Sequence, residues 1–193
     1  MKLLEERIAK DGVAIGDDIL KVDMFLNHQI DPVLMDDMAK EFYRLFSDCP
    51  VNKVVTVEAS GIPLAVMTAK YFGVPCVFAK KSSHKNVGTD VYNARCYSFT
   101  HGKEYNMIIS RKYLNYNDKV LVIDDFLAGG NACNALLDIV KQADAEVCGI
   151  GIAIEKGFQP GGKILRDMGY NVRSLAIVES MSDGKIVFRS DDG

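Results

Sequence analysis

One stretch of the chain, residues 119–135 with the sequence KVLVIDDFLAGGNACNA, constrains the fold most strongly. Its apolar run at residues 120–123 is typical of a central strand that is buried on both faces of a sheet. Asp124 and Asp125 come directly after this run. In an open α/β sheet, ligands bind outside the carboxyl ends of the strands, so we expect the two acids to lie in a binding crevice.

A loop of small residues, 128–130, separates these acids from a segment with helical spacing that extends through Val140. Asn131 stands where the N-cap of this helix is expected. No bulky side chain keeps a phosphate away from the backbone N–H groups of the loop, and the N-terminus of the helix adds positive potential. Strand, acids, loop and helix together predict an anion-binding site.

This stretch resembles the phosphoribosyl-pyrophosphate (PRPP) motif of type I phosphoribosyltransferases. That motif is an apolar run, two acids, two or three small residues, then Thr-Gly-Gly and a hydroxyl residue. The match holds through Asp125 and at the two glycines, and it departs where the hydroxyls would stand. The bacterial xanthine phosphoribosyltransferase subgroup has a similar hydroxyl-poor loop. The resemblance implies that backbone amides bind the 5′-phosphate of PRPP, at Ala128, Gly129, Gly130, Asn131 and Ala132.

Length and composition limit the other possibilities. A chain of 193 residues favours one domain, residues 1–193, with a sizeable core. The net charge of −3 gives no electrostatic case for nucleic acid as the main partner. The five cysteines are scattered without a C-x-x-C pair, as expected of buried free thiols in a reducing compartment. The N-terminus lacks a signal-peptide pattern, and no apolar run approaches the ~20 residues of a membrane span. We therefore expect a soluble cytoplasmic protein without a membrane partner.

A second turn of small residues is expected at the same edge of the sheet. Residues 53–57 and 74–79 are predicted strands, with a helix between them. Strand, helix and strand at this spacing imply a right-handed parallel crossover, which places the turn at 58–61 beside the first loop. Taken alone, the turn is also explained by helix capping through Ser60. The resemblance implies that the pyrophosphate of PRPP binds here, at Ala59, Ser60 and Gly61.

Residues 80–102 are a long polar stretch, which is typical of a lid or an insert in a compact domain. A solvated hairpin is the alternative, and the alternation of Val91, Ala94, Tyr97 and Phe99 allows two short strands within the loop. In the family that the chain resembles, this region is a flexible loop that closes over PRPP, and a basic residue near its start reaches the pyrophosphate, often across a dimer interface. The resemblance implies this role for Lys81, with Lys80 as the second candidate, and it implies a homodimer.

The purine site is expected where a predicted strand, residues 146–154, ends near Lys156. The alternatives are a solvated strand-end charge for Lys156 and an ordinary turn for Asn27. The resemblance implies that Leu20, Asn27 and Lys156 bind the purine. Lysine donors suit the oxo group at position 6, and the Asn27 amide suits the oxo group at position 2 of xanthine, although a flipped amide would accept from guanine. Two aromatic residues could stack on the base or belong to the core: Phe126 and Phe158.

The resemblance implies an α/β fold with an open, mostly parallel sheet flanked by helices. A small N-terminal hood is expected, with residues 1–30 and about 156–193 contributing to it. The implied reaction transfers the 5-phosphoribosyl group from PRPP to xanthine and gives xanthosine 5′-monophosphate and pyrophosphate. Asp124 and Asp125 would hydrogen-bond the ribose hydroxyls and favour the positive charge that builds on the ring. We expect Mg²⁺ to bind mainly through PRPP and water, without a direct protein ligand.

Three alternatives stay open at this point. Guanine or hypoxanthine could replace xanthine as the substrate. The chain could be a non-catalytic PRPP-sensing regulator, although it has neither the length nor the basic surface for an added DNA-binding domain. It could also be a nucleotide-binding α/β domain with other chemistry, but the Walker A pattern and G-x-G-x-x-G after a first strand are both absent from the sequence.

Overall fold

The computed structural model describes residues 1–82, 90–98, 103–182 and 184–190. Its elements in chain order are α1 (Lys2–Asp11), β1 (Val13–Ile15), β2 (Ile19–Lys21), a π-helical turn (Asp23–Asn27), α2 (Pro32–Leu45), β3 (Lys53–Val57), α3 (Gly61–Phe72), β4 (Cys76–Ser82), β5 (Val91–Ser98), β6 (Lys103–Ser110), a 3₁₀ turn (Arg111–Tyr113), β7 (Lys119–Leu127), α4 (Asn131–Gln142), β8 (Glu146–Lys156), α5 (Gly161–Asp167), β9 (Val172–Ser182) and β10 (Lys185–Phe188).

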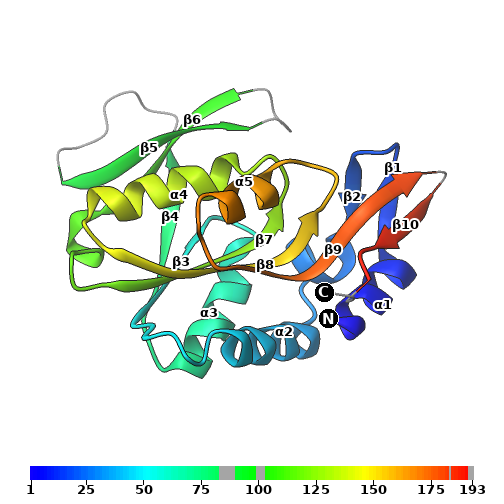
Figure 1. Cartoon of the computed structure of the whole chain (residues 1–193), viewed down its shortest axis with the longest axis horizontal. Coiled ribbons are helices and arrows are strands. Elements are labelled where there is room, and N and C mark those ends of the chain that lie inside the picture. The colour runs from blue at the N-terminus through cyan, green and yellow to red at the C-terminus, as the bar shows by residue number, and fades with distance from the viewer. Residues whose placement is uncertain (83–89, 99–102, 183, 191–193) are drawn as a thin grey trace.

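Within these described ranges, eight strands form one sheet in the order β10-β9-β8-β7-β3-β4-β6-β5, and β1 pairs with β2 in a separate hairpin (Figure 1). The five strands from β9 to β4 are parallel to one another, while β10 and β6 run antiparallel to their neighbours. The crossover from β3 through α3 to β4 is parallel, as predicted. The predicted open, mostly parallel sheet flanked by helices is confirmed.

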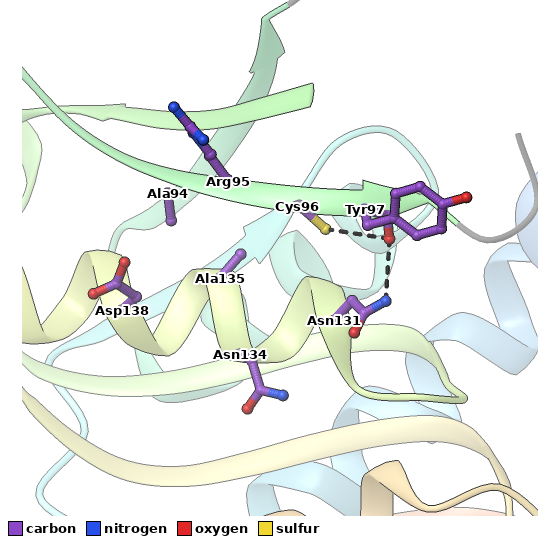
Figure 2. Close-up of a pocket in the computed structure, with 8 residues that line it drawn as sticks. All are labelled: Ala94, Arg95, Cys96, Tyr97, Asn131, Asn134, Ala135 and Asp138. Atoms are coloured by element: carbon purple, nitrogen blue, oxygen red, sulfur yellow. Dashed lines mark hydrogen bonds between the residues drawn. The ribbon is translucent and has the colours of Figure 1, made fainter. Parts of the chain in front are cut away.

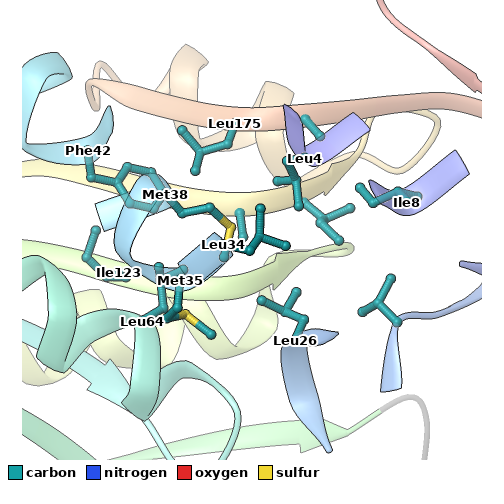
Figure 3. Close-up of a cluster of buried hydrophobic side chains, with 14 of the residues drawn as sticks. Leu4, Ile8, Leu26, Leu34, Met35, Met38, Phe42, Leu64, Ile123 and Leu175 are labelled. Carbon is teal, nitrogen blue, oxygen red and sulfur yellow. The ribbon is translucent and has the colours of Figure 1, made fainter. Parts of the chain in front are cut away.

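The central strand β7 is covered on both faces, which is why its sequence is apolar without alternation. Leu121 and Ile123 belong to the core cluster that packs against α2 and α3 (Figure 3). Val120 and Val122 belong to the second cluster, with the apolar face of α4. Successive side chains of a strand point to opposite faces, so one short run anchors both layers of the fold. The strand therefore holds its carboxyl end in a fixed position.

The N-terminal segments are tied together by one arginine. The Arg7 guanidinium lies 2.6 Å from a carboxylate oxygen of Asp11 on its own helix and 2.6 Å from one of Asp31. It also lies 5.1 Å from the ring centroid of Phe25, in the π-helical turn. Asp31 caps α2 by accepting the backbone N–H groups at the start of that helix. Arg7 thus joins α1 and the π-helical turn to the start of α2.

Two strands occupy part of the stretch that was predicted as a polar loop, residues 80–102. β4 continues through Ser82, and β5 occupies residues 91–98 and pairs with β6 along its whole length. The hairpin alternative therefore describes this part of the chain better. The polar side chain of Arg95 is exposed between the buried Ala94 and Cys96, and this half-polar alternation made the strand look like a loop. The rest of the predicted loop, 83–89 and 99–102, lies outside the described residues.

The five cysteines are free, as predicted. Burial raises the pKa of the Cys76 and Cys148 thiols to about 11, so both are protonated and weakly nucleophilic at neutral pH. None of the described helices is both long and apolar enough to cross a bilayer.

Candidate functional site

Three neighbouring parallel strands end at one edge of the sheet. β3 leads into the turn at 58–61, β7 leads into the loop at 128–130, and β8 ends at Lys156. The three strands are adjacent in the order β8-β7-β3. The loop, the turn and the lysine that the sequence singled out therefore lie along the edge where ligands bind in such sheets.

The turn at 58–61 lies directly against the acids of β7. A Cβ added to Gly61 would lie 2.2 Å from Thr56 Oγ1 and 2.9 Å from Asp124 Oδ1, so only glycine fits here without displacing its neighbours. Thr56 is fully buried, and its hydroxyl has no hydrogen-bond partner among the described residues. Ser60 occupies the N-cap position of α3, but its side chain makes no capping hydrogen bond. The capping alternative for this turn is therefore wrong.

The two acids are almost removed from water. Asp124 is 5% exposed and Asp125 is 8% exposed, and the strand continues past them to Leu127 instead of ending before them. The backbone N–H of Asp125 donates to Asp124 Oδ1 at 3.0 Å. Burial, and then the adjacent Asp125 carboxylate, raise the pKa of Asp124 well above its usual value. Asp124 thus favours a cation in its surroundings, or else a proton.

Lys81 is the basic side chain that reaches this part of the site. Its backbone N–H donates to Glu58 Oε1 at 2.6 Å, which joins β4 to the turn at 58–61. Its ammonium lies 5.4 Å from the ring centroid of Tyr105, and its charge acts to lower the pKa of Asp124. Lys80 lines an apolar groove instead, because successive side chains of a strand face opposite sides. The geometry therefore favours Lys81 of the two candidates.

The N-cap residue of α4, the helix after the loop at 128–130, is Gly130 and not Asn131. Gly130 has a φ of 87°, a left-handed conformation that glycine adopts without strain, and it is the N-cap of α4. Asn131 is the first residue of the helix, and its Nδ2 donates to the carbonyl oxygen of Tyr97 at 3.1 Å (Figure 2). The predicted N-cap role of Asn131 is wrong, because its side chain hydrogen-bonds the backbone of Tyr97 in the distant strand β5.

A second side-chain amide joins the other end of α4 to the same strand. Gln142 Oε1 accepts the backbone N–H of Asn93 at 3.3 Å, and Gln142 Nε2 donates to the Asn93 carbonyl at 2.7 Å. Between the two ends, β5 and α4 enclose a pocket of about 350 Å³, whose lining side chains are drawn in Figure 2. A smaller pocket of about 180 Å³ lies over the loop itself and is lined by residues 126–133 together with Cys96, Tyr97 and Tyr105. The β5–β6 hairpin therefore forms one wall of the pocket over the loop at 128–130.

The residues predicted to bind the purine lie in the N-terminal segments and at the end of β8. Lys156 Nζ donates to the carbonyl oxygen of Asp18, in the turn that precedes Leu20. Burial lowers the pKa of Lys156 below its usual value, while the charge of Asp18 opposes this shift. Leu20 is buried at 7% exposure, and Asn27 is exposed at the end of the π-helical turn. Lys156 and the Leu20 hairpin are thus in contact, whereas none of the described hydrogen bonds joins Asn27 to either.

The two aromatic candidates differ in their surroundings. Phe126 is half-buried, packs against the core cluster on the α2 side and also lines the pocket over the loop. Phe158 is 37% exposed in the turn after β8. Phe126 therefore has a core role, and Phe158 is the ring with free surface.

Sequence reasoning missed four residues behind the loop: Glu155, Gly161, Gly162 and Arg166. The glycine pair directly after Pro160 was the available signal, since two glycines at the start of a helix are explained by a close approach of other groups. The Gly161 N–H donates to the Ala128 carbonyl at 3.1 Å, so α5 supports the loop from behind.

Comparison with known proteins covers nearly the whole chain. The family model described as phosphoribosyl transferase domain matches residues 22–174. A xanthine phosphoribosyltransferase of Ruminiclostridium cellulolyticum is 52% identical over 188 residues, which are 97% of this chain and 99% of that protein. Another from Clostridium novyi is 52% identical over 98% of this chain and 100% of its own length. A third, from Acinetobacter baumannii, is 50% identical over 97% of this chain and 98% of its own length.

Solved structures agree on the fold. Adenine phosphoribosyltransferase of Rhodothermus marinus superposes with a TM-score of 0.74, at 19% identity, over 92% of this chain and 100% of that one. The enzyme from Giardia lamblia gives a TM-score of 0.67 at 26% identity, over 76% of this chain and 80% of that one. The resemblance inferred from the PRPP motif is confirmed. Because a family model matches most of the chain and relatives are 52% identical over 97–98% of it, the chain belongs to the phosphoribosyltransferase family.

Proposed function

We propose that this protein transfers the 5-phosphoribosyl group from PRPP to xanthine, and that it releases xanthosine 5′-monophosphate and pyrophosphate. The family membership supports the reaction class, and the relatives named xanthine phosphoribosyltransferase support the base. The observation that carries the site assignment is the close approach of Gly61 to Asp124. The turn proposed to bind the pyrophosphate is therefore next to the acids proposed to bind the ribose.

PRPP is proposed to lie along the carboxyl edge of the sheet. Its 5′-phosphate binds the backbone amides of residues 128–132, where the left-handed Gly130 turns the chain and α4 begins. Its pyrophosphate binds the turn formed by Ala59, Ser60 and Gly61, with the Lys81 ammonium beside it. The ribose lies between the two, over Asp124 and Asp125.

The proposed chemistry depends on alignment and electrostatics. Cleavage of the bond to pyrophosphate runs ahead of attack by the purine nitrogen, so positive charge builds on the ribose ring. A buried carboxylate beside that ring stabilises the charge more than water would, because the surroundings do not have to reorganise. The raised pKa of Asp124 is consistent with this role, since the group gains most from a cationic neighbour.

Mg²⁺ is proposed to enter with PRPP. The described residues contain no group of three or more His, Cys, Asp and Glu side chains that could hold a metal ion, so phosphate oxygens and water would supply most ligands. The carboxylates nearest the ribose hydroxyls, Asp124 and Asp125, are oxygen groups of the kind that magnesium-bound waters contact. When bound, the ion neutralises charge on the departing pyrophosphate.

The purine is proposed to bind under a hood formed by residues 1–30 and the chain after residue 156, as part of one domain. The Lys156 ammonium donates to the oxo group at position 6, and its contact with Asp18 ties that lysine to the hairpin that carries Leu20. The Asn27 amide donates to the oxo group at position 2. Adenine carries an amino group at position 6, which cannot accept a hydrogen bond from Lys156, and this disfavours adenine.

A homodimer is proposed as the working assembly. An apolar groove of about 490 Å³ lies between β4 and β6, and two of its aromatic side chains have free surface: Phe78 is 39% exposed and Tyr113 is 60% exposed. Burial of this groove between two copies would bring each Lys81 strand close to its neighbour. Sedimentation equilibrium of the parent and of Phe78→Glu tests the assembly, and a monomeric parent contradicts it.

The experiment that tests the function is a spectrophotometric assay with PRPP and Mg²⁺, run separately with xanthine, guanine, hypoxanthine and adenine. Fastest turnover with xanthine and none with adenine is the expected result. Turnover of guanine in preference to xanthine would keep the mechanism and overturn the assignment at position 2. If no base is used although PRPP protects the protein against thermal unfolding, the chain is a PRPP sensor and the proposed function is wrong.

A further inference from the structure

An ion pair between a buried carboxylate and a partly exposed arginine lies behind the loop, away from the proposed substrates. Glu155 is 2% exposed, and the Arg166 guanidinium binds both of its oxygens, at 2.8 and 2.7 Å. The Ser174 hydroxyl of β9 donates to the same carboxylate. Burial alone would raise the pKa of Glu155, but these hydrogen bonds outweigh it and hold the pKa below its usual value. The carboxylate is therefore ionised and joins three elements: β8, α5 and β9.

The first two residues of α5 connect this ion pair to the loop. A Cβ on Gly162 would lie 1.9 Å from Glu155 Oε1, so the helix rests directly on the carboxylate. A Cβ on Gly161 would lie 2.3 Å from the Ala128 carbonyl oxygen and 2.7 Å from the Gly130 nitrogen, so the helix rests on the loop as well. One glycine contacts the ion pair and the preceding glycine contacts the loop.

The position of α5 depends on these contacts because the helix is too short to be stable alone. It has seven residues, fewer than the ~12 that an isolated helix needs in water. Its buried apolar side chain is Leu165, and the bidentate Arg166 fixes the direction of the helix as well as its distance from β8. If the ion pair is lost, the Gly161 backbone is free to move away from the loop.

We propose that the Glu155–Arg166 pair is a positioning device for the 5′-phosphate of PRPP, acting through Gly161 on the backbone amides at 128–132. The inference rests on the proposed function, which places that phosphate on the loop. The inference also predicts that loss of the ion pair weakens binding of PRPP but not binding of the purine. Glu155 and Lys156 are consecutive residues of one strand and point to opposite faces, so release of Arg166 disturbs the phosphate end and leaves the purine lysine in place.

The test is a comparison of KM for PRPP and KM for xanthine in the full-length protein with Mg²⁺. Arg166→Met keeps the aliphatic stem and removes the pair; we expect KM for PRPP to rise about tenfold and KM for xanthine to change less than about twofold. Arg166→Lys keeps the positive charge but cannot bind both carboxylate oxygens as the planar guanidinium does, so KM for PRPP should rise less than in Arg166→Met. The matched control is Lys163→Met, which breaks the exposed Lys163–Asp167 pair on the same helix and should change neither constant.

Removal of one partner from a buried pair can unfold a protein, so a second variant is needed. Glu155→Gln with Arg166→Met removes both charges and leaves no unpaired carboxylate, and it should show the same selective rise. If KM for PRPP in this double variant equals that of Lys163→Met, the inference is wrong. An equal rise in both constants also overturns it, because that result describes a purely structural pair.

A different variant tests whether the 5′-phosphate binds at the loop at all. Gly130→Ala places a side chain at a φ of 87° within the loop itself. If this variant keeps the parent KM for PRPP, the phosphate does not bind there and the proposed site is wrong. If Gly130→Ala raises KM for PRPP and Arg166→Met does not, the site assignment stands and only the positioning role of the ion pair is refuted.

Discussion

Asp124 and Asp125 stand near the end of a strand that is covered on both faces, whereas Asn27 stands on an exposed turn of the N-terminal hood. The phosphate end of the proposed site is thus built into the core of the sheet. The purine end is assembled from short N-terminal segments, and a hydrogen bond from the Lys156 ammonium to the Asp18 carbonyl joins them to the end of β8. The groups proposed to act in catalysis are thus anchored by the core, whereas Asn27, which is proposed to select the base, lies where substitution disturbs the core least.

The strongest test of this comparison is Asp124→Asn at the core end. We expect turnover to fall about 10²–10³-fold, because a preorganised charge beside the ribose is lost. The same change should raise the thermal midpoint by about 2–4 °C at neutral pH, because burial and the neighbouring Asp125 disfavour the ionised Asp124 carboxylate in the folded protein. Asp125→Asn should also lower turnover with little loss of fold. Unchanged turnover in both variants would contradict the role of the acids.

The stability gain of Asp124→Asn should depend on pH in a defined direction. The pKa of Asp124 in the folded protein lies well above the usual 3.8, so the folded state holds this proton more tightly than the unfolded chain does. The contribution of the group to stability is therefore greatest below pH 3.8 and is lost as the pH rises towards the folded-state pKa. Thermal midpoints of parent and variant should converge in acid and separate at neutral pH; a constant difference would argue against this assignment.

The next effect in size is expected for Gly61→Ala at the boundary of the core. The added methyl group would collide with Thr56 and with Asp124 Oδ1. Overpacking of this kind costs about 1–3 kcal/mol of stability, and it displaces the turn from the acids. KM for PRPP should therefore rise by about tenfold while KM for xanthine stays close to the parent value. Gly73→Ala at the C-cap of the same helix meets no atom within 4 Å but is strained by its φ of 67°, so it controls for a loss of stability without a collision at the acids.

Lys156→Ala tests the purine end. Loss of a hydrogen bond from a charged donor corresponds to an increase of about 10- to 100-fold in KM for xanthine. KM for PRPP should change less than twofold, since the loop at 128–130 does not depend on this side chain. A variant as active as the parent with xanthine would remove Lys156 from the site.

The smallest effect is expected for Asn27, the most exposed of the proposed purine residues. Asn27→Asp replaces a donor by an acceptor, which suits the amino group at position 2 of guanine and repels the oxo group of xanthine. The ratio of kcat/KM for xanthine to that for guanine should fall by about tenfold at most, without a change in thermal midpoint. The neutral control is Asn27→Gln. A ratio equal to that of the parent would show that another group reads position 2.

The sequence predicts the core end of the molecule better than its edges. β7, its two acids and the small-residue loop follow from one local pattern, because a strand buried on both faces has an uninterrupted apolar sequence. The crossover through α3 follows for the same reason. The proposed role of the acids comes from the resemblance, since no local pattern distinguishes a ribose-binding carboxylate from any other buried acid.

What could not be predicted depends on contacts between distant residues. Asn131 was expected at the N-cap because asparagine often caps helices. Its side chain instead hydrogen-bonds the Tyr97 carbonyl, and Gly130 is the N-cap residue. The alternation at residues 91–97 allowed a short strand, but the full length of β5 was not predicted because only one side of the strand is buried. Glu155 and Arg166 carry no local sign of their pairing, because the contact forms only when α5 folds back onto β8.

The side-chain amides at the two ends of α4 also affect how the protein behaves at high concentration. β5 is the last strand on its side of the sheet, and an unpaired strand edge is a template on which another chain can add a strand and start aggregation. Gln142 already binds the backbone N–H and C=O of Asn93, and Asn131 binds the carbonyl of Tyr97. An incoming strand would have to displace both amides, so α4 protects the sheet against edge-to-edge aggregation on this side.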